Sequence, residues 1–182
     1  LLQAQPGLPT EFVIDSWPFA AYSSAKGDRF DICVSSWTRI GDNVMPPRLK
    51  CFSNYQNGRL AALEANVSGY DWPVMLDSAG KVSEGPGACV ALIRNGELIF
   101  PIVTSSILES VTRDTVMKIA TQLLHMPVIE RMVDRTELYI ADEIFFAGTG
   151  WEIKPVTSVD RIIVGGGTAG PLTQRIADLY RA

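Results

Sequence analysis

Four short stretches of the chain carry residues whose chemistry could combine in one site. Lys50 in "RLKCFSNY" offers a primary amine, and Glu84 in "KVSEGPG" offers a carboxylate at a Gly-Pro-Gly bend. "LESVTRD" places Ser110 and Thr112 at the expected start of a helix, where free backbone N–H groups attract an anion. Thr149 in "FAGTG" adds a hydroxyl between two glycines. The four stretches together offer an amine, a carboxylate and an anion cradle.

Each stretch also has an ordinary explanation. A single lysine is usually a solvated surface charge, Ser110 or Thr112 can cap a helix, and Thr149 can occupy a turn. One ligand would use all of the stretches at once: pyridoxal 5'-phosphate needs an amine for a Schiff base, a phosphate cradle and a carboxylate facing its ring nitrogen. The sequence therefore predicts that Lys50 binds this cofactor and that Glu84 keeps its ring nitrogen protonated.

The composition argues against several other kinds of site. The formal net charge of -4, without a basic stripe, is not that of a nucleic-acid surface. No apolar run in the sequence approaches the length that a bilayer requires, so we expect no membrane partner. The three cysteines lack metal-ligand spacing and are odd in number, which argues against a disulfide framework or a metal site and favours a reducing compartment, the cytoplasm. The single histidine, His125, is interpreted as a helix-end residue.

One glycine-rich stretch imitates a nucleotide-binding motif. "VGGGTAGPL" contains GxGxxG, running from Gly165 to Gly170, between an expected strand and an expected helix. A dinucleotide site needs a βαβ unit of about 30 residues and an acidic residue about 20 positions further on. Twelve residues follow Gly170. We therefore interpret the stretch as a strand-to-helix turn.

The pattern of apolar residues, turns and caps favours an α+β domain spanning residues 1–182. The strands are expected at residues 11–17, 31–37, 127–133 and 144–150, with a strand pair in 152–165 and hairpins in 73–85 and 88–103. The helices are expected at residues 57–70, 107–124 and 170–180. In the first helix, Leu60, Leu63 and Val67 form the expected apolar face. Asp134 and Glu137 form a capping box for a further short helix.

Six motifs follow one another in the order of a known family: "VSSWTR", "KCFSNY", "LDSAGKVSEGPG", "ILESVTRD", "ELYIADEIFFAGTGWEIKPV" and "GPLT". On these motifs the chain resembles the fold-type IV, pyridoxal-phosphate-dependent aminotransferases, and among them the branched-chain amino acid aminotransferases. Asn54 and Tyr55, four and five places after Lys50, are similar to the branched-chain group. The resemblance implies the larger C-terminal domain of this family, a D-amino-acid-aminotransferase-like pseudobarrel of mixed strands with flanking helices.

The resemblance also implies roles for individual residues at the cofactor. Lys50 would form the Schiff base and act as the acid–base of the proton transfer. Tyr55 would donate a hydrogen bond to the phenolic oxygen of the cofactor, and Glu84 would contact the ring nitrogen. The backbone of Val111 and Thr112, with the hydroxyl of Thr149, would hold the phosphate.

At the substrate, the resemblance implies that backbone amides of Thr149 and Gly150 receive the carboxylate. Two positions in "WPFAAY" match residues that line the family's side-chain pocket: Phe19 and Tyr22. The chain departs from the family in "GTGW", where Gly150 and Trp151 stand at positions more often held by alanine.

The implied reaction transfers an amino group between a branched-chain L-amino acid (leucine, isoleucine or valine) and 2-oxoglutarate, in a homodimer. Three alternatives stay open: an aminotransferase for D-amino acids or amines, an aminodeoxychorismate lyase, and an inactive truncated domain. The family's smaller N-terminal domain, which supplies an arginine to the phosphate, is not recognised in this sequence. We therefore expect the chain alone to show weakened or absent turnover.

Overall fold

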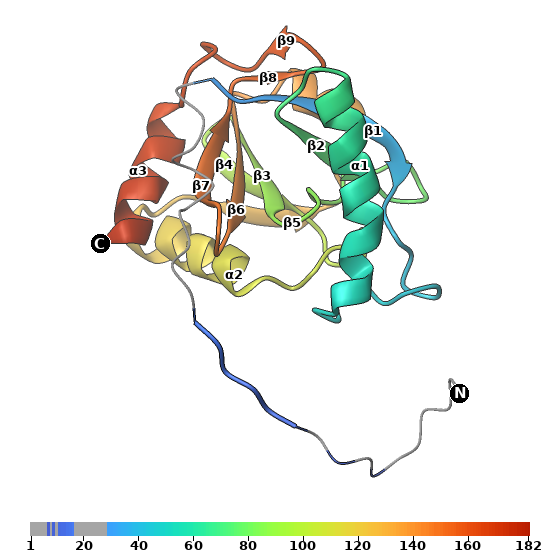
Figure 1. The fold of residues 1–182 in the computed structure, drawn as a ribbon. Helices are drawn as coiled ribbons and strands as arrows, with labels where there is room; N and C mark the ends of the chain where they lie inside the picture. Colours follow the sequence, from blue (N-terminus) through green and yellow to red (C-terminus); the bar gives the residue numbers. More distant parts are fainter. Residues whose placement is uncertain (1–6, 8, 10, 17–28) are drawn as a thin grey trace.

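The computed structural model describes Gly7, Pro9, residues 11–16 and residues 29–182 (Figure 1). Its strands form two sheets, one of four strands in the order β2-β1-β8-β9 and one of five strands in the order β5-β4-β3-β6-β7. The four-stranded sheet consists of β1 (Asp31–Thr38), β2 (Trp72–Leu76), β8 (Ser158–Val159) and β9 (Ile162–Ile163). The five-stranded sheet consists of β3 (Cys89–Arg94), β4 (Glu97–Pro101), β5 (Val128–Arg131), β6 (Glu143–Gly148) and β7 (Glu152–Val156).

Helices cover the outer faces of the two sheets (Figure 1). Helix α1 (Tyr55–Val67) packs on β1 and β2, whereas α2 (Val111–Lys118) and α3 (Pro171–Arg181) pack on the five-stranded sheet. Both sheets contain parallel and antiparallel pairs. Within residues 29–182 they remain two separate sheets and close into no barrel, so the expected mixed α/β fold is confirmed as two mixed sheets with flanking helices.

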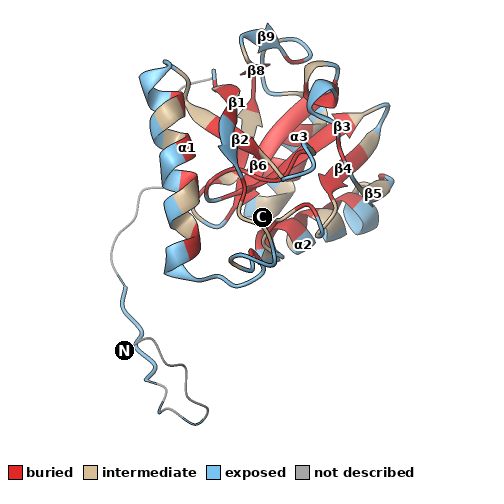
Figure 2. Ribbon diagram, turned by 90° about the vertical axis from the view of Figure 1, so that its right-hand side faces the viewer, coloured by how far each residue is buried: buried red, intermediate tan, exposed pale blue. Residues whose placement is uncertain are grey.

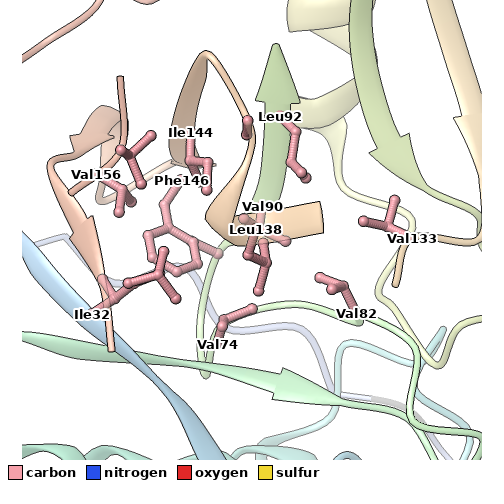
Figure 3. Packing of buried hydrophobic residues seen from close by; sticks show 14 of the residues in the cluster. Ile32, Val74, Val82, Val90, Leu92, Val133, Leu138, Ile144, Phe146 and Val156 are labelled. Carbon is pink, nitrogen blue, oxygen red and sulfur yellow. The ribbon is translucent and has the colours of Figure 1, made fainter. Parts of the chain in front are cut away.

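The core lies in two layers, one on each face of the five-stranded sheet. Figure 2 shows that strands of this sheet are largely buried, whereas the helices are exposed on their outer sides. Residues alternate along β3, so that Val90 and Leu92 face the four-stranded sheet while Ala91 and Ile93 face α2 and α3. Figure 3 shows the inner layer, where side chains from both sheets meet and Phe146 occupies the centre. A sheet buried on both faces explains why its strands read as continuous apolar runs.

Several expected elements are confirmed. The strand expected at 31–37 is β1, and the hairpin expected in 88–103 is β3 and β4. Its turn residues, Asn95 and Gly96, have φ angles of 53° and 79°, which is the backbone that this dipeptide adopts most readily. His125 does lie just beyond a helical end, at φ 53°.

Two expectations about apolar residues are wrong. Residues 11–16 form no strand, and Phe12 is 86% exposed. The expected apolar face of α1 points to solvent, and the face that packs on the sheet consists of Gly58, Ala61 and Ala65. The small side chains form the packed face because they let the helix lie close to the chain beneath it. A Cβ on Gly58 would stand 2.8 Å from Pro86 Cβ.

The capping box is also wrong. Residues 135–139 form a 3-10 helix, and Asp134 makes no side-chain cap there. Glu137 instead accepts hydrogen bonds from Arg94 and Arg131, which hold the pKa of its carboxyl below the usual value. Ion pairs with arginines of β5 and β3 thus override the local capping signal.

The glycine-rich stretch is confirmed as a turn between β9 and α3. Gly165 and Gly167 have positive φ angles, and the first amides of α3 are already satisfied inside the protein. Leu172 N and Thr173 N donate to the buried carboxylate of Glu143, at 3.1 and 2.7 Å. This helix start is therefore occupied by an internal anion rather than open to a phosphate.

Candidate active site

A cavity of about 520 Å³ opens between the start of α1, the bend after Val82 and the start of α2. It brings together all six residues expected at the cofactor: Lys50, Tyr55, Glu84, Val111, Thr112 and Thr149. Gly150 lines an adjoining hollow of about 310 Å³, which shares Tyr55 and Gly87 with the cavity. Phe19 and Tyr22 lie outside the described residues.

Lys50 lies in the connection between β1 and α1, where side-chain hydrogen bonds set the path of the backbone. The buried Asn54 donates through Nδ2 to the carbonyl oxygens of Pro46 and Leu49, at 2.9 Å each. Cys51 N donates to Leu49 O at 2.8 Å, which tightens the turn around Lys50. The lysine is therefore presented at the cavity wall by a closed loop.

Backbone hydrogen bonds with β2 hold the segment that contains Glu84 inside the protein. Met75 N donates to Glu84 O at 3.0 Å, and Ser83 N donates to Met75 O at 2.9 Å. Gly85 then allows a close approach, because a Cβ at this position would stand 2.8 Å from the Phe146 ring. The bend expected from "EGPG" is thus packed against both the core and α1.

The Glu84 carboxylate is 4% exposed and paired with Arg39. Arg39 Nη2 lies 2.7 Å from Oε1, Arg39 Nε donates to the same oxygen at 3.0 Å, and Leu108 N donates to Oε2 at 3.2 Å. Burial raises the pKa of Glu84 to about 7, while Arg39, the Leu108 amide and Lys50 act in the opposite direction. A buried carboxyl whose pKa lies near neutral pH is suited to holding a proton on a ligand.

The start of α2 supplies an anion cradle. Ser110 is the N-cap residue, and its Oγ accepts a hydrogen bond from Arg113 N at 3.3 Å. The helical N–H groups of Val111 and Thr112 belong to the first turn, which has no intrahelical acceptors. Thr149, at the end of β6, lines the same cavity. Capping by Ser110 and an anion site at Val111 and Thr112 are therefore compatible.

Of the two cysteines near the cavity, Cys89 lines it and Cys51 does not. Burial raises the pKa of Cys89 to about 12, and its thiol donates to Ala147 O at 3.0 Å. Cys51 is exposed, and a hydrogen bond with Ser53 lowers the pKa of its thiol. Across the described residues no group of His, Cys, Asp and Glu is arranged to hold a metal ion. The amine and the carboxylate remain the reactive groups of the cavity.

Arg39 is the residue that sequence reasoning missed. It ends the motif "VSSWTR", directly after β1, and an arginine there reads as a solvated surface charge. Its burial depends on a carboxylate 45 positions away in the chain. A buried acid in need of a cation was the available signal, because a buried carboxylate is rarely tolerated without a partner.

We expect the pH dependence of stability to report the ionisation of Glu84. Its pKa in the folded chain is raised to about 7, from 4.5, so the folded state holds the proton more tightly than the unfolded state. Stability contributed by this group is therefore lost as pH rises from 4.5 to 7. Between pH 5 and 8 the loss amounts to about 2–3 kcal/mol.

Glu84→Gln removes this titration, and urea unfolding of both proteins at pH 5 and pH 8 measures the difference. The unpaired Arg39 left by the substitution lowers stability at both pH values, so the slope rather than the absolute stability is compared. Parallel pH profiles for the two proteins would contradict the assigned burial of the charge.

The family model described as amino-transferase class IV matches residues 4–159. The chain belongs to this family. Its cavity, with an amine and a buried carboxylate on opposing segments, lies in the part of the chain that the family model covers.

Within the family, the chain is similar to branched-chain-amino-acid aminotransferases. The Salmonella typhimurium enzyme is 40% identical over 177 residues, which are 96% of this chain and 57% of that enzyme. The branched-chain amino acid aminotransferase of Thermobaculum terrenum, solved in its PLP-form, is 50% identical with a TM-score of 0.83 over 85% of this chain and 51% of that one. The Escherichia coli enzyme is 40% identical with a TM-score of 0.87, over 91% of this chain and 55% of that one. The chain thus spans little more than half the length of these relatives.

Proposed function

We propose that this chain binds pyridoxal 5'-phosphate and forms the cofactor-bearing part of a transaminase that acts on branched-chain L-amino acids and 2-oxoglutarate. The observation that carries the proposal is the joint placement of Lys50 and Glu84 on one cavity, with a helix start between them. The relatives support the substrate class, because the solved Thermobaculum terrenum and Escherichia coli structures that the chain resembles are branched-chain enzymes.

The donor set of the cavity fits this cofactor. The residues that would hold it are Lys50 at the aldehyde, Tyr55 at the phenolic oxygen, Glu84 at the ring nitrogen, and Val111, Thr112 and Thr149 at the phosphate. The volume of about 520 Å³ lies within the range of pockets that bind cofactor-sized ligands. When bound, the cofactor supplies an electron sink for the pair left behind as the substrate loses its α-proton.

The residues of the chain provide binding, orientation and proton transfer. Lys50 Nζ would hold the cofactor through its aldehyde carbon, and the same amine, when free, would accept the proton from the substrate Cα. Glu84, held by Arg39, would keep a proton on the ring nitrogen. The backbone amides in the first turn of α2 would bind the phosphate and so help to orient the cofactor.

Trp151 is a departure from the family's usual residue, next to the proposed substrate carboxylate site. Its side chain packs mostly in the core. It is 8% exposed, and it contacts Trp72 at a ring distance of 4.8 Å and Phe30 at 5.6 Å. The neighbouring Gly150 backbone still faces the hollow beside the cavity. Trp151 lines the same hollow, so its ring forms part of the wall next to the proposed carboxylate site.

The homodimer and the cytoplasmic location are part of the proposal. The cysteines Cys33, Cys51 and Cys89 are free thiols, and a reducing compartment keeps cysteines in this state. Among the described residues no helix is long and apolar enough to cross a membrane. Sedimentation of the purified chain with cofactor measures the oligomeric state.

A substrate panel tests the proposed function. The purified chain and the complete product of its reading frame are loaded with the cofactor and offered leucine, isoleucine, valine, their D-enantiomers, an aliphatic amine and aminodeoxychorismate. The proposal predicts turnover with the branched L-amino acids and 2-oxoglutarate. Faster turnover of a D-amino acid, an amine or aminodeoxychorismate would contradict the substrate class, and failure of both proteins to bind the cofactor would favour an inert domain. The expectation of weakened turnover by this chain alone stays a prediction, and full rates would overturn it.

A further inference from the structure

We propose that Arg39 is a positioning residue, which aims the Glu84 carboxylate into the cavity, favours its charged form against the effect of burial, and links it to the loop that carries Lys50. The inference rests on the proposed function in one respect, namely that Glu84 serves a protonated ring nitrogen. The placement of Arg39 itself rests on geometry alone.

The two oxygens of Glu84 are held differently. Oε1 accepts hydrogen bonds from Nε and Nη2 of Arg39, at 3.0 and 2.7 Å, whereas Oε2 accepts one from Leu108 N at 3.2 Å. A carboxylate offers about four lone-pair positions. With two positions used on Oε1 and one on Oε2, the free position belongs to Oε2. This oxygen is therefore the one that receives a ligand N–H.

Arg39 also connects the carboxylate to the lysine loop. Its Nη1 donates to Asn54 O at 3.4 Å, and the Asn54 side chain in turn closes the loop by binding Pro46 O and Leu49 O. Its own backbone is anchored to β2, because Arg39 N donates to Leu76 O at 2.8 Å. A single guanidinium thus joins the two segments that must face each other across a cofactor.

Only part of this role could be filled by another cation. The guanidinium presents several donors in a rigid plane, and here they are divided between one carboxylate oxygen and one backbone carbonyl. A lysine would keep the positive charge but would lack the planar set of N–H donors of the guanidinium. Lys50 is the other cation that acts on Glu84, but its effect on the pKa of that carboxyl is smaller than the effect of Arg39, and burial keeps the nearby Cys89 thiol of β3 neutral. Arg39 therefore supplies the main positive charge that acts on Glu84.

The test compares Arg39→Gln, Arg39→Lys, Glu84→Gln and the double variant Arg39→Gln/Glu84→Gln. The cofactor-free chain is labelled at the glutamate side-chain carboxyl carbons, and NMR follows the titration of Glu84. The Glu84 signal is assigned as the one that disappears in Glu84→Gln. We expect Arg39→Gln to raise the pKa of Glu84 further, by at least about one unit, because burial then acts with less opposition. Arg39→Lys should titrate close to the wild-type chain.

Cofactor affinity is the second readout. We expect Glu84→Gln and Arg39→Gln each to weaken pyridoxal phosphate binding roughly 30-fold, and the double variant to be no weaker than Glu84→Gln, because Arg39 acts through Glu84. Arg39→Lys should weaken binding several-fold, since the planar set of donors is lost. Arg181→Gln is the matched control: this arginine pairs with Glu152 at the surface, and the change should alter neither readout.

The outcomes separate the two proposals. An unchanged Glu84 titration in Arg39→Gln, or additive losses of affinity in the double variant, would overturn the role of Arg39. If the wild-type chain bound no cofactor, the proposed function would fail while the titration still decided the placement of Arg39. Should Arg39→Gln not fold, as circular dichroism would show, Arg39→Lys carries the test, because the proposal predicts a nearly unchanged Glu84 titration together with cofactor binding weakened several-fold. Unweakened binding by Arg39→Lys would then overturn the role of the guanidinium.

Discussion

Replacing Lys50 with methionine is expected to abolish the visible absorbance of the chain incubated with pyridoxal phosphate, and to lower transamination by roughly a thousandfold or more. Methionine has a similar length but no amine, so the covalent link to the aldehyde cannot form. Lys50 lies at the exposed wall of the cavity in a loop closed by Asn54, and therefore the fold should survive the change. Absorbance spectra and initial rates with leucine and 2-oxoglutarate measure the effect.

Lys118→Met provides the matched control for this substitution. Lys118 is exposed at the end of α2 and pairs only locally with Asp114, so its loss should leave the spectrum and the rates unchanged. If Lys50→Met kept the visible band while Lys118→Met lost it, the assignment of the reactive lysine would be wrong. Unfolding curves for both variants establish that any loss is chemical rather than structural.

Replacing Gly58 with alanine is expected to destabilise the chain by about 1–2 kcal/mol and to weaken cofactor binding. A Cβ at this position would stand 2.8 and 2.9 Å from Pro86 Cβ and Cα, so α1 must move away from the bend that carries Glu84. Overpacking costs roughly 1–3 kcal/mol, and two contacts below 3 Å with Pro86 place Gly58 in the upper part of that range, at about 2–3 kcal/mol. The helix-propensity gain of about 1 kcal/mol leaves a net loss of about 1–2 kcal/mol. The melting temperature should fall by roughly 2–8 °C.

Gly41→Ala is the control for the glycine substitution. Gly41 has no positive φ angle, and a Cβ there would meet no atom within 4 Å. The same chemical change should therefore leave melting temperature and cofactor affinity almost unaltered. A stabilised Gly58→Ala protein would show that α1 and the bend are not in the close contact described above, and that helix propensity decides the outcome.

Much of the site was predictable because its signals are local. The first turn of α2 follows from a serine cap and the residues after it, and the β3–β4 hairpin follows from Asn95 and Gly96. The roles of Lys50 and Glu84 required a different argument, since each is ordinary alone and only one ligand needs both. The cavity that they share confirms their juxtaposition.

The features that escaped prediction depend on contacts between distant segments. The choice of Gly58 and Ala61 over Leu60 as the packed face of α1 is made by the Pro86 bend, not by periodicity. Glu137 does not form the expected capping box because Arg94 of β3 and Arg131 of β5 donate hydrogen bonds to its carboxylate. Arg39 is buried because a carboxylate far along the chain lies opposite. In each case tertiary geometry overrides a local preference.

Borohydride reduction followed by peptide mass mapping tests the central claim most directly. The chain is incubated with pyridoxal phosphate, reduced, digested and analysed for the mass of the attached pyridoxyl group. A single labelled site at Lys50, lost on dialysis against a competing amine before reduction, is the result that the shared cavity of Lys50 and Glu84 predicts. Label distributed over surface lysines, or absent from the peptide that contains Lys50, would contradict it.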